Sequence, residues 1–306
     1  MKVRLNKYII NVTILILSIT LFACEESCDE PVSTSEETIN GITVKWRSQI
    51  SEKQKSVVSD ILNSMVLVEG DYFVMGATPE QKNFARSNEF PNSYIRLSDY
   101  YICKYEVTDE QFNSIMEDSK SASSHYSSRI SFEEWMRFIH ILQDLTELNF
   151  SLPSEAQWEF AARGGKQSKG YIYPGSNDVE EIRSSSFIVG SNVPNELGIY
   201  NMADLKSEWC VDFYNALVPG NVLVDWIQKN GDYHIVRGGN FRCTKEIDKY
   251  SNPSNNSSVN YRFGFESRYL DEEMDFRNCR ITSRAYYYDS NPGIDAIGCR
   301  LVINIK

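Results

Sequence analysis

Turn-forming residues divide the second half of this chain into short segments. After Ala162 the helical pattern of apolar residues ends, and glycine, proline and asparagine recur at close intervals: Arg163-Gly164-Gly165, Pro174-Gly175, Pro194-Asn195 and Arg237-Gly238-Gly239-Asn240. Glycine supplies backbone angles that other residues avoid and proline fixes φ, so these stretches favour turns. The sequence therefore predicts loops carried on a scaffold, with the polar stretch 244–275 as a long surface insertion.

Regular secondary structure is predicted mainly before this point. Met65–Val68 is the first clear strand, and three capping boxes indicate helices, because each pairs a hydroxyl with a Glu or Gln three residues later. The boxes are Thr108/Gln111, Ser131/Glu134 and Ser154/Gln157. The second precedes apolar residues that recur on one helical face, which predicts a buried side: Phe132, Trp135, Phe138, Ile139, Leu142 and Leu145.

The N-terminus has the pattern of a lipoprotein signal peptide. Basic residues precede the apolar run Tyr8–Ala23, which ends in Leu21-Phe22-Ala23-Cys24. The run is short for a membrane-spanning helix and acidic residues follow at once, which disfavours a retained span. We expect residues 1–23 to be removed and Cys24 to be lipidated. The protein would then be attached through this lipid to the outer membrane of the cell envelope, periplasmic or surface-exposed.

The segments that follow the signal peptide differ in character. Residues 24–40 are rich in Glu, Ser and Thr, which predicts an acidic tether with too little apolar surface to fold. Residues 41–64 predict a helix or an extended lead segment, and residues 65–306 the main domain.

The charge of the mature chain excludes some partners. The whole chain has 31 Lys+Arg and 42 Asp+Glu, and residues 1–23 contain three of the basic residues and none of the acidic ones. The mature chain therefore has 28 basic and 42 acidic residues, a net charge of −14. An acidic body of this kind repels nucleic acid and anionic headgroups. We expect no nucleic-acid partner.

Cysteines and histidines limit the metal chemistry. Seven cysteines occur, at 24, 28, 103, 210, 243, 279 and 299, without a CxxC pair. With Cys24 lipidated, the other six allow fifteen complete disulfide pairings or free thiols. The three histidines lie far apart in the sequence, so a zinc site of the usual kind is not expected.

Seven segments of the chain have distinctive motifs: Met65–Gly76 (MVLVEGDYFVMG), Lys104–Thr108 (KYEVT), Leu152–Gly165 (LPSEAQWEFAARGG), Asn195–Met202 (NELGIYNM), Ser207–Cys210 (SEWC), Val236–Phe241 (VRGGNF) and Ile297–Val302 (IGCRLV). In this order, over residues 65–303, they resemble motifs of the formylglycine-generating enzyme (sulfatase-modifying factor) family. The third segment is the most specific. The resemblance implies an irregular, loop-rich α+β fold, similar to C-type lectins, with little regular secondary structure.

The resemblance also implies a catalytic chemistry. Members of the family that make formylglycine oxidise a cysteine of a target sulfatase with molecular oxygen at a copper(I) ion held by two thiolates, which are soft ligands suited to Cu(I). The first thiol corresponds to Cys243, but Asp248 stands at the second position, and a hard carboxylate binds Cu(I) poorly. Cys279 is a displaced candidate for the second thiol. The sequence favours structural or disulfide roles for Cys243 and Cys279.

A calcium loop is the other metal site that the resemblance implies. Glu208 and the carbonyls of Asp204 and Lys206 are its candidate ligands, because calcium binds six to eight oxygens. The ammonium of Lys206 would oppose the ion.

Three functions remain open. The first is a non-catalytic binding or scaffold module for an unknown protein or glycan, with Tyr286, Tyr287 and Tyr288 as candidate contacts. The second is a copper-dependent formylglycine-generating oxidase acting on exported sulfatases, and the third is calcium-dependent glycan binding.

Overall fold

The computed structural model describes residues 35–117, 130–182, 188–239, 279–287 and 297–305. Cys24, Cys28, Cys243, Asp248 and Tyr288 lie outside these ranges.

The described chain begins with a hairpin inside the predicted tether. Strand β1 (Ser35–Ile39) pairs antiparallel with β2 (Ile42–Trp46), so residues 35–40 are folded and the tether boundary at residue 40 was wrong. Asn40 and Gly41 have φ of 51° and 78°, which is the backbone of a two-residue hairpin turn favoured by Asn-Gly. The alternation in β2 buries its apolar residues against the core.

The lead segment is both extended and helical. After β2, helix α1 (Glu52–Asn63) starts at a further capping box, Ser51/Gln54. The hairpin turn is fixed to the end of this helix, since Asn40 Nδ2 donates to the carbonyls of Leu62 and Met65 at 3.0 and 2.8 Å.

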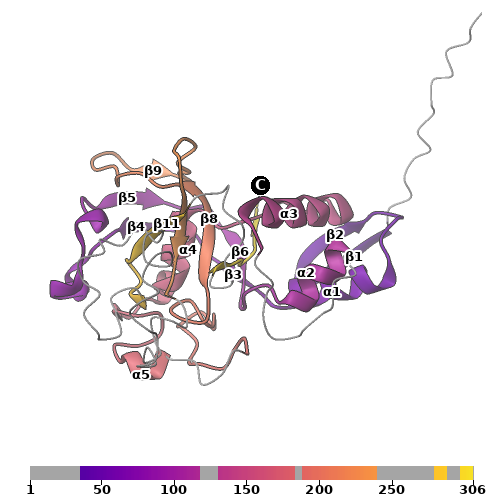
Figure 1. Cartoon of the computed structure of the whole chain (residues 1–306), viewed down its shortest axis with the longest axis horizontal. Helices are drawn as coiled ribbons and strands as arrows, with labels where there is room; N and C mark the ends of the chain where they lie inside the picture. Colours follow the sequence, from indigo (N-terminus) through magenta and orange to yellow (C-terminus); the bar gives the residue numbers. More distant parts are fainter. Residues whose placement is uncertain (1–34, 118–129, 183–187, 240–278, 288–296, 306) are drawn as a thin grey trace, which may run out of the picture. The chain divides into compact units, whose positions relative to one another are not determined.

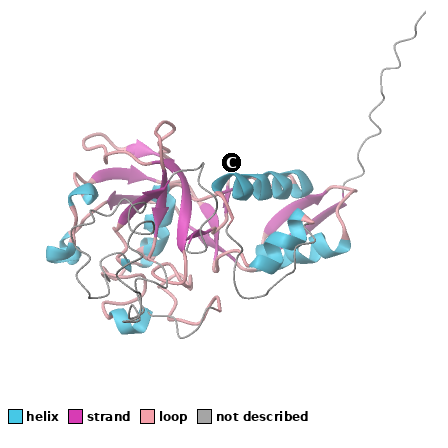
Figure 2. Cartoon of the chain, viewed as in Figure 1, coloured by secondary structure: helices cyan, strands magenta, loops and turns pink. Residues whose placement is uncertain are grey.

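Three further sheets form the main domain (Figures 1 and 2). The first has the order β3 (Met65–Val68), β6 (Tyr100–Cys103), β13 (Val302–Asn304), β7 (Phe150–Ser151). The second has the order β11 (Arg284–Tyr287), β10 (His234–Arg237), β8 (Ser207–Phe213), β12 (Ile297–Gly298). The third has the order β4 (Tyr72–Met75), β5 (Ser93–Arg96), β9 (Leu223–Val224).

All three predicted capping boxes are confirmed. They begin α2 (Asp109–Met116), α3 (Phe132–Thr146) and α4 (Glu155–Ala162), and a one-turn helix, α5 (Val179–Ile182), follows. Short 3₁₀ turns span Pro79–Phe84, Ser87–Glu89 and Gly165–Gln167. The predicted face of α3 is buried except for Leu145, which is half-buried. Loops connect these short elements throughout the domain, as the turn residues predict (Figure 2).

Buried ion pairs join the C-terminal strands to earlier parts of the chain. Four arginines of the last third of the sequence contact glutamates far before them: Arg237–Glu159, Arg280–Glu89, Arg284–Glu155 and Arg300–Glu208. Removing one partner of such a pair leaves a buried, uncompensated charge, which costs roughly 3–5 kcal/mol. These pairs therefore hold the C-terminal part of the chain against residues that precede it in the sequence.

Among the described residues, helices are too short or too polar to span a bilayer.

Candidate functional site

The most specific sequence segment, Leu152–Gly165, organises the core. Helix α4 places Glu155 and Glu159 on its buried side, where Glu159 binds Arg163 and Arg237 and Glu155 binds Arg284. These carboxylates are committed to ion pairs, so this segment encodes the fold.

The Arg-Gly-Gly segment ends at a close approach of two backbones. Gly238 has a φ of 73°, which favours glycine. A Cβ atom on Gly239 would lie 2.4 Å from Cys279 Sγ and 2.6 Å from the carbonyl oxygen of Ala203. Only glycine fits there. Cys279 is fully buried beneath this corner, next to Ile182 and Ala203.

The described residues include one of the two candidate copper thiols. They place one candidate thiol, Cys279, in the interior, while Cys243 lies outside the described ranges. Cys103, Cys210 and Cys299 are buried free thiols. Burial raises the pKa of Cys103 to about 11 and the pKa values of Cys210 and Cys299 well above the usual range, which disfavours the thiolates that a metal needs.

The candidate calcium ligands are likewise engaged elsewhere. Both carboxylate oxygens of Glu208 accept hydrogen bonds from Arg300, and one also accepts from Trp158 Nε1 at 2.7 Å. The described part of the chain contains no group of three or more His, Cys, Asp or Glu residues that could hold a metal ion. The carboxylate of Glu208 is therefore engaged by a guanidinium and an indole in this arrangement.

The loop that carries the other two candidates is held by polar contacts. Asp204 Oδ1 accepts from the side-chain amides of Asn192 and Asn201 at 3.2 and 3.4 Å. The backbone amide of Lys206 donates to Glu106 Oε1 at 3.2 Å. Burial, together with the charge of Glu208, raises the pKa of Glu106 well above its usual range. Leu205 adopts a φ of 69°, an unfavourable angle for a leucine.

The candidate tyrosines divide between the core and a surface cluster. Tyr287 is buried against Trp209, with ring centroids 6.1 Å apart, so its predicted role as an exposed contact was wrong. Tyr286 is half-buried and lies 4.3 Å from the ring of Tyr214 and 4.9 Å from that of Tyr233. Because β8, β10 and β11 are adjacent, the fold gathers three tyrosines that are distant in sequence.

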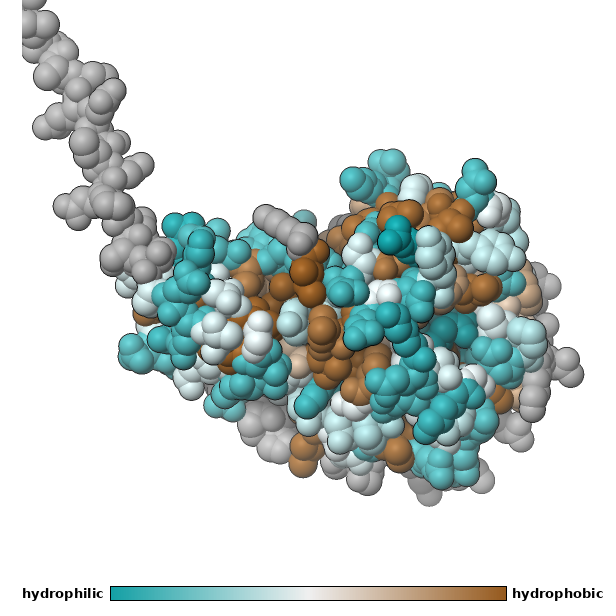
Figure 3. All heavy atoms as spheres, turned by 180° about the vertical axis from the view of Figure 1, so that it is seen from behind, coloured by the Kyte–Doolittle hydropathy of each residue, from teal (hydrophilic) through white to brown (hydrophobic). Residues whose placement is uncertain are grey.

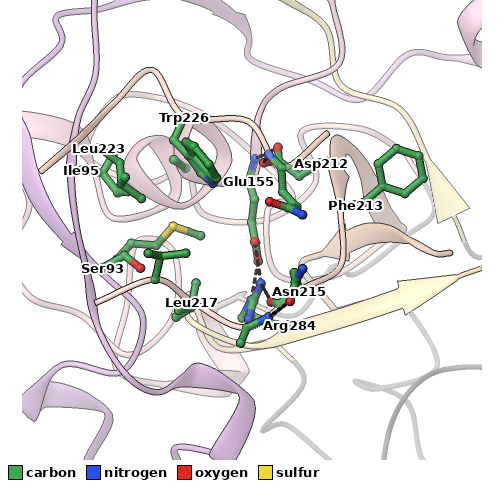
Figure 4. Close-up of a pocket in the computed structure, with 15 residues that line it drawn as sticks. Ser93, Ile95, Glu155, Asp212, Phe213, Asn215, Leu217, Leu223, Trp226 and Arg284 are labelled. Atoms are coloured by element: carbon green, nitrogen blue, oxygen red, sulfur yellow. Dashed lines mark hydrogen bonds and ion pairs between the residues drawn. The ribbon is translucent and has the colours of Figure 1, made fainter. Parts of the chain in front are cut away.

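A small cavity lies beside this tyrosine cluster (Figure 4). Glu155 and Arg284 point toward one another across it, and Arg284 also donates to the carbonyl oxygen of Asn215 at 3.0 Å. The volume of the cavity is about 30 Å³. Since a water needs roughly 10–15 Å³, this space accommodates about one or two waters and no larger substrate.

Asp212 is the unusual ionisable group in the cavity wall. Its two oxygens accept from the backbone amides of Glu155 and Gln228 at 2.7 and 2.8 Å. Burial raises the pKa of Asp212 to about 7, and the negative charge of Glu155 adds to the shift. Its hydrogen bonds hold α4 to the loop after β9, which is a structural role.

The family can now be assigned. Residues 51–277 match the family described as sulfatase-modifying factor enzyme 1-like domain, which is more than half of the chain. The chain belongs to this family. The expected irregular, loop-rich α+β fold is confirmed, since two solved structures share it. "Treponema denticola variable protein 1" has a TM-score of 0.57 at 15% identity, covering 90% of this chain and 100% of that one. PvdO of Pseudomonas aeruginosa has a TM-score of 0.55 at 18% identity, covering 79% and 94%.

Relatives of this family member have diverse names. "Serine/threonine-protein kinase pkn1" of Chlamydia pneumoniae is 28% identical over 252 residues, which cover 70% of this chain and 39% of that protein. "Chaperone protein LppX" of Paenibacillus barcinonensis is 26% identical, covering 55% and 77%. "Formylglycine-generating enzyme" of Streptomyces coelicolor is 30% identical over 122 residues, covering 33% and 38%. The chain thus spans well under half the length of pkn1.

Proposed function

We propose that this protein is an exported lipoprotein, anchored in the cell envelope through a lipid on Cys24, whose family domain binds a protein or glycan partner without catalysing formylglycine formation. The domain would stand outside the cytoplasm and act as a binding or scaffold module.

The burial of Cys279 is the observation that carries this proposal. A copper(I) site of the family type needs two thiolates that approach one ion. Here one candidate thiol is enclosed by the backbone of Gly239 and Ala203, and the second position of the motif holds Asp248. Relatives named as a kinase and a chaperone are compatible with a domain that serves functions other than sulfatase maturation.

An aldehyde assay tests the absence of catalysis. The purified protein, reconstituted with Cu(I), would be incubated in air with a peptide that contains the sulfatase motif Cys-x-Pro-x-Arg, and the product measured by mass spectrometry. We expect no aldehyde. A matched Asp248→Cys variant asks whether the second ligand alone is missing, because a thiolate there would restore a soft donor.

The alternative function is a formylglycine-generating oxidase. One observation favours it: Cys279 touches the Arg-Gly-Gly segment, and Cys243 follows Gly239 by four residues in the sequence. Aldehyde that disappears in both Cys243→Ser and Cys279→Ser would establish the oxidase and overturn the proposed function. Copper content of the purified protein, at one ion per chain, would support the same conclusion.

Calcium-dependent glycan binding is less well supported. The carboxylate of Glu208, its main candidate ligand, is bonded to Arg300 and Trp158. Calcium titration monitored by thermal unfolding would detect an ion that binds the folded state.

The anchor is tested separately. A Cys24→Ala protein should lose its partition into the membrane fraction, because no lipid could then be attached. Quantitative retention in that fraction would contradict lipidation at Cys24. Protease shaving of intact cells would distinguish surface exposure from a periplasmic position.

A further inference from the structure

An open groove with aromatic walls lies beside helix α5. Its volume is about 620 Å³, within the roughly 300–1,000 Å³ typical of ligand sites. Phe84, Tyr171 and Tyr173 supply its aromatic surface, and Asp178 and Glu181 supply carboxylates. The groove is thus far larger than the cavity at Asp212.

The wall of this groove is preformed. Tyr173 and Ser176 exchange backbone hydrogen bonds of 3.0 and 3.3 Å around a tight turn. Gly175 in that turn has a φ of 89°, and a Cβ there would lie 2.7 Å from the carbonyl oxygen of Pro194. Ser176 Oγ donates to Glu181 and accepts from the amide of Asp178. A wall held by these contacts loses little entropy when a ligand binds.

The chemistry of the groove selects a cation. The ammonium of Lys169 already lies over the ring of Tyr171, 5.8 Å from its centroid, so this ring attracts a positive charge from its own chain. Asp178 and Glu181 are exposed beside it and add negative potential in a chain that is acidic overall.

The groove combines two kinds of surface. On the face shown in Figure 3, apolar groups lie among hydrophilic ones. The groove itself offers aromatic area and carboxylates together.

We propose that this groove binds a basic segment of a partner protein by taking a lysine or arginine side chain between Tyr171 and the carboxylates of Asp178 and Glu181. This inference rests on the proposed binding function and names the partner's chemistry. Lys169 acts as an internal competitor for this ring, because its ammonium lies 5.8 Å from the ring centroid.

Fluorescence anisotropy with a labelled peptide of alternating lysine and glycine tests the proposal, using the full chain in a non-ionic detergent at low salt. The lysine peptide should bind, and the same peptide with acetylated lysines should not, because acetylation removes the charge. Tyr171→Leu should raise Kd by about 2–5-fold, the range expected for an exposed cation–π contact, while Tyr171→Phe should retain affinity. Glu181→Gln should weaken binding by a similar factor.

Lys169→Gln gives the discriminating result. It should lower Kd by about 2–5-fold, since it removes both the repulsion and the competitor for the ring. Glu133→Gln, on the exposed side of α3, is the matched control for loss of one negative charge and should leave Kd unchanged. Thermal unfolding of each variant confirms that it is folded.

Three results would contradict the proposal that the groove binds a basic segment. They are absence of lysine-peptide binding, an effect of Glu133→Gln equal to that of Glu181→Gln, and an unchanged Kd in Lys169→Gln. Spermidine that displaces the peptide at an equal concentration of charge would assign the groove to small polyamines and contradict the protein partner. The aldehyde assay is independent: aldehyde would overturn the proposed function, whereas failure of peptide binding would overturn only this site.

Discussion

The role of a single residue in this protein depends on its buried neighbours as much as on the motif in which it lies. Glu208 lies in a family motif that implies calcium binding, yet its neighbours in space, Arg300 and Trp158, make it one half of a buried ion pair. The motif could be read from the sequence, but the partner 92 residues later could not, because nothing local specifies it.

Replacing Glu208 separates its structural role from a metal role. Glu208→Gln should lower the free energy of unfolding by roughly 3–5 kcal/mol, because the guanidinium of Arg300 stays buried without its counter-charge. The loss should be the same with calcium or with a chelator, as measured by urea denaturation. A loss that appears only when calcium is present would show that Glu208 binds the ion.

Asp212 should make stability depend on pH. Its pKa is about 7 in the folded protein and ~3.9 when unfolded, so the folded state binds more protons between these values. The stability linked to this proton is fully present below pH ~4 and is lost as pH rises through about 7.

Comparison with Asp212→Asn isolates that contribution. The variant should lack this part of the decline in the free energy of unfolding between pH 4 and 7, although the loss of one backbone hydrogen bond lowers its stability by a constant ~1 kcal/mol. Parallel pH profiles for the two proteins would contradict the assigned shift.

At the scale of elements, local signals predicted three of the helices, whereas contacts between distant segments were not predicted. The three capping boxes begin helices as expected, because a cap involves residues only three apart. The Asn40-Gly41 hairpin signal is equally local, but the acidic composition of residues 24–40 predicted a tether there instead. The tyrosine cluster at Tyr286 could not be foreseen, since its members meet only through strand pairing.

Helix α3 permits a graded test of these local rules. Ser131→Ala should cost roughly 1 kcal/mol, because Ser131 Oγ accepts from the amide of Glu134 at 3.2 Å. Trp135→Ala should cost ~3–5 kcal/mol, because Trp135 is fully buried and contacts Phe112 and Phe138. Chemical denaturation measures both. Equal, negligible losses would mean that the helix face does not pack as described.

At the scale of the whole molecule, two positions that are 40 residues apart in the sequence lie together. Gly239 and Cys279 are in close contact. Buried pairs hold both flanks, since Arg237 contacts Glu159 and Arg280 contacts Glu89. The core is therefore fixed on each side of this point.

Shortening the chain between Gly239 and Cys279 tests whether the described core depends on it. A protein that lacks residues 244–275, with a short Gly-Ser linker in their place, should unfold cooperatively at a temperature within a few degrees of the parent, because both flanks keep their buried ion pairs. Differential scanning calorimetry measures this. A broad transition, or a large loss of unfolding enthalpy, would show that the deleted residues belong to the core.

The contact between Gly239 and Cys279 also determines how the free energy of folding depends on the number of residues between them. Because the two ends meet, the intervening chain closes a loop, and closure entropy grows only with the logarithm of loop length. Doubling the number of residues there costs about 0.6 kcal/mol, less than the loss of a single buried hydrogen bond partner. By this entropy term alone, a longer or shorter chain between Gly239 and Cys279 changes the stability of the domain little.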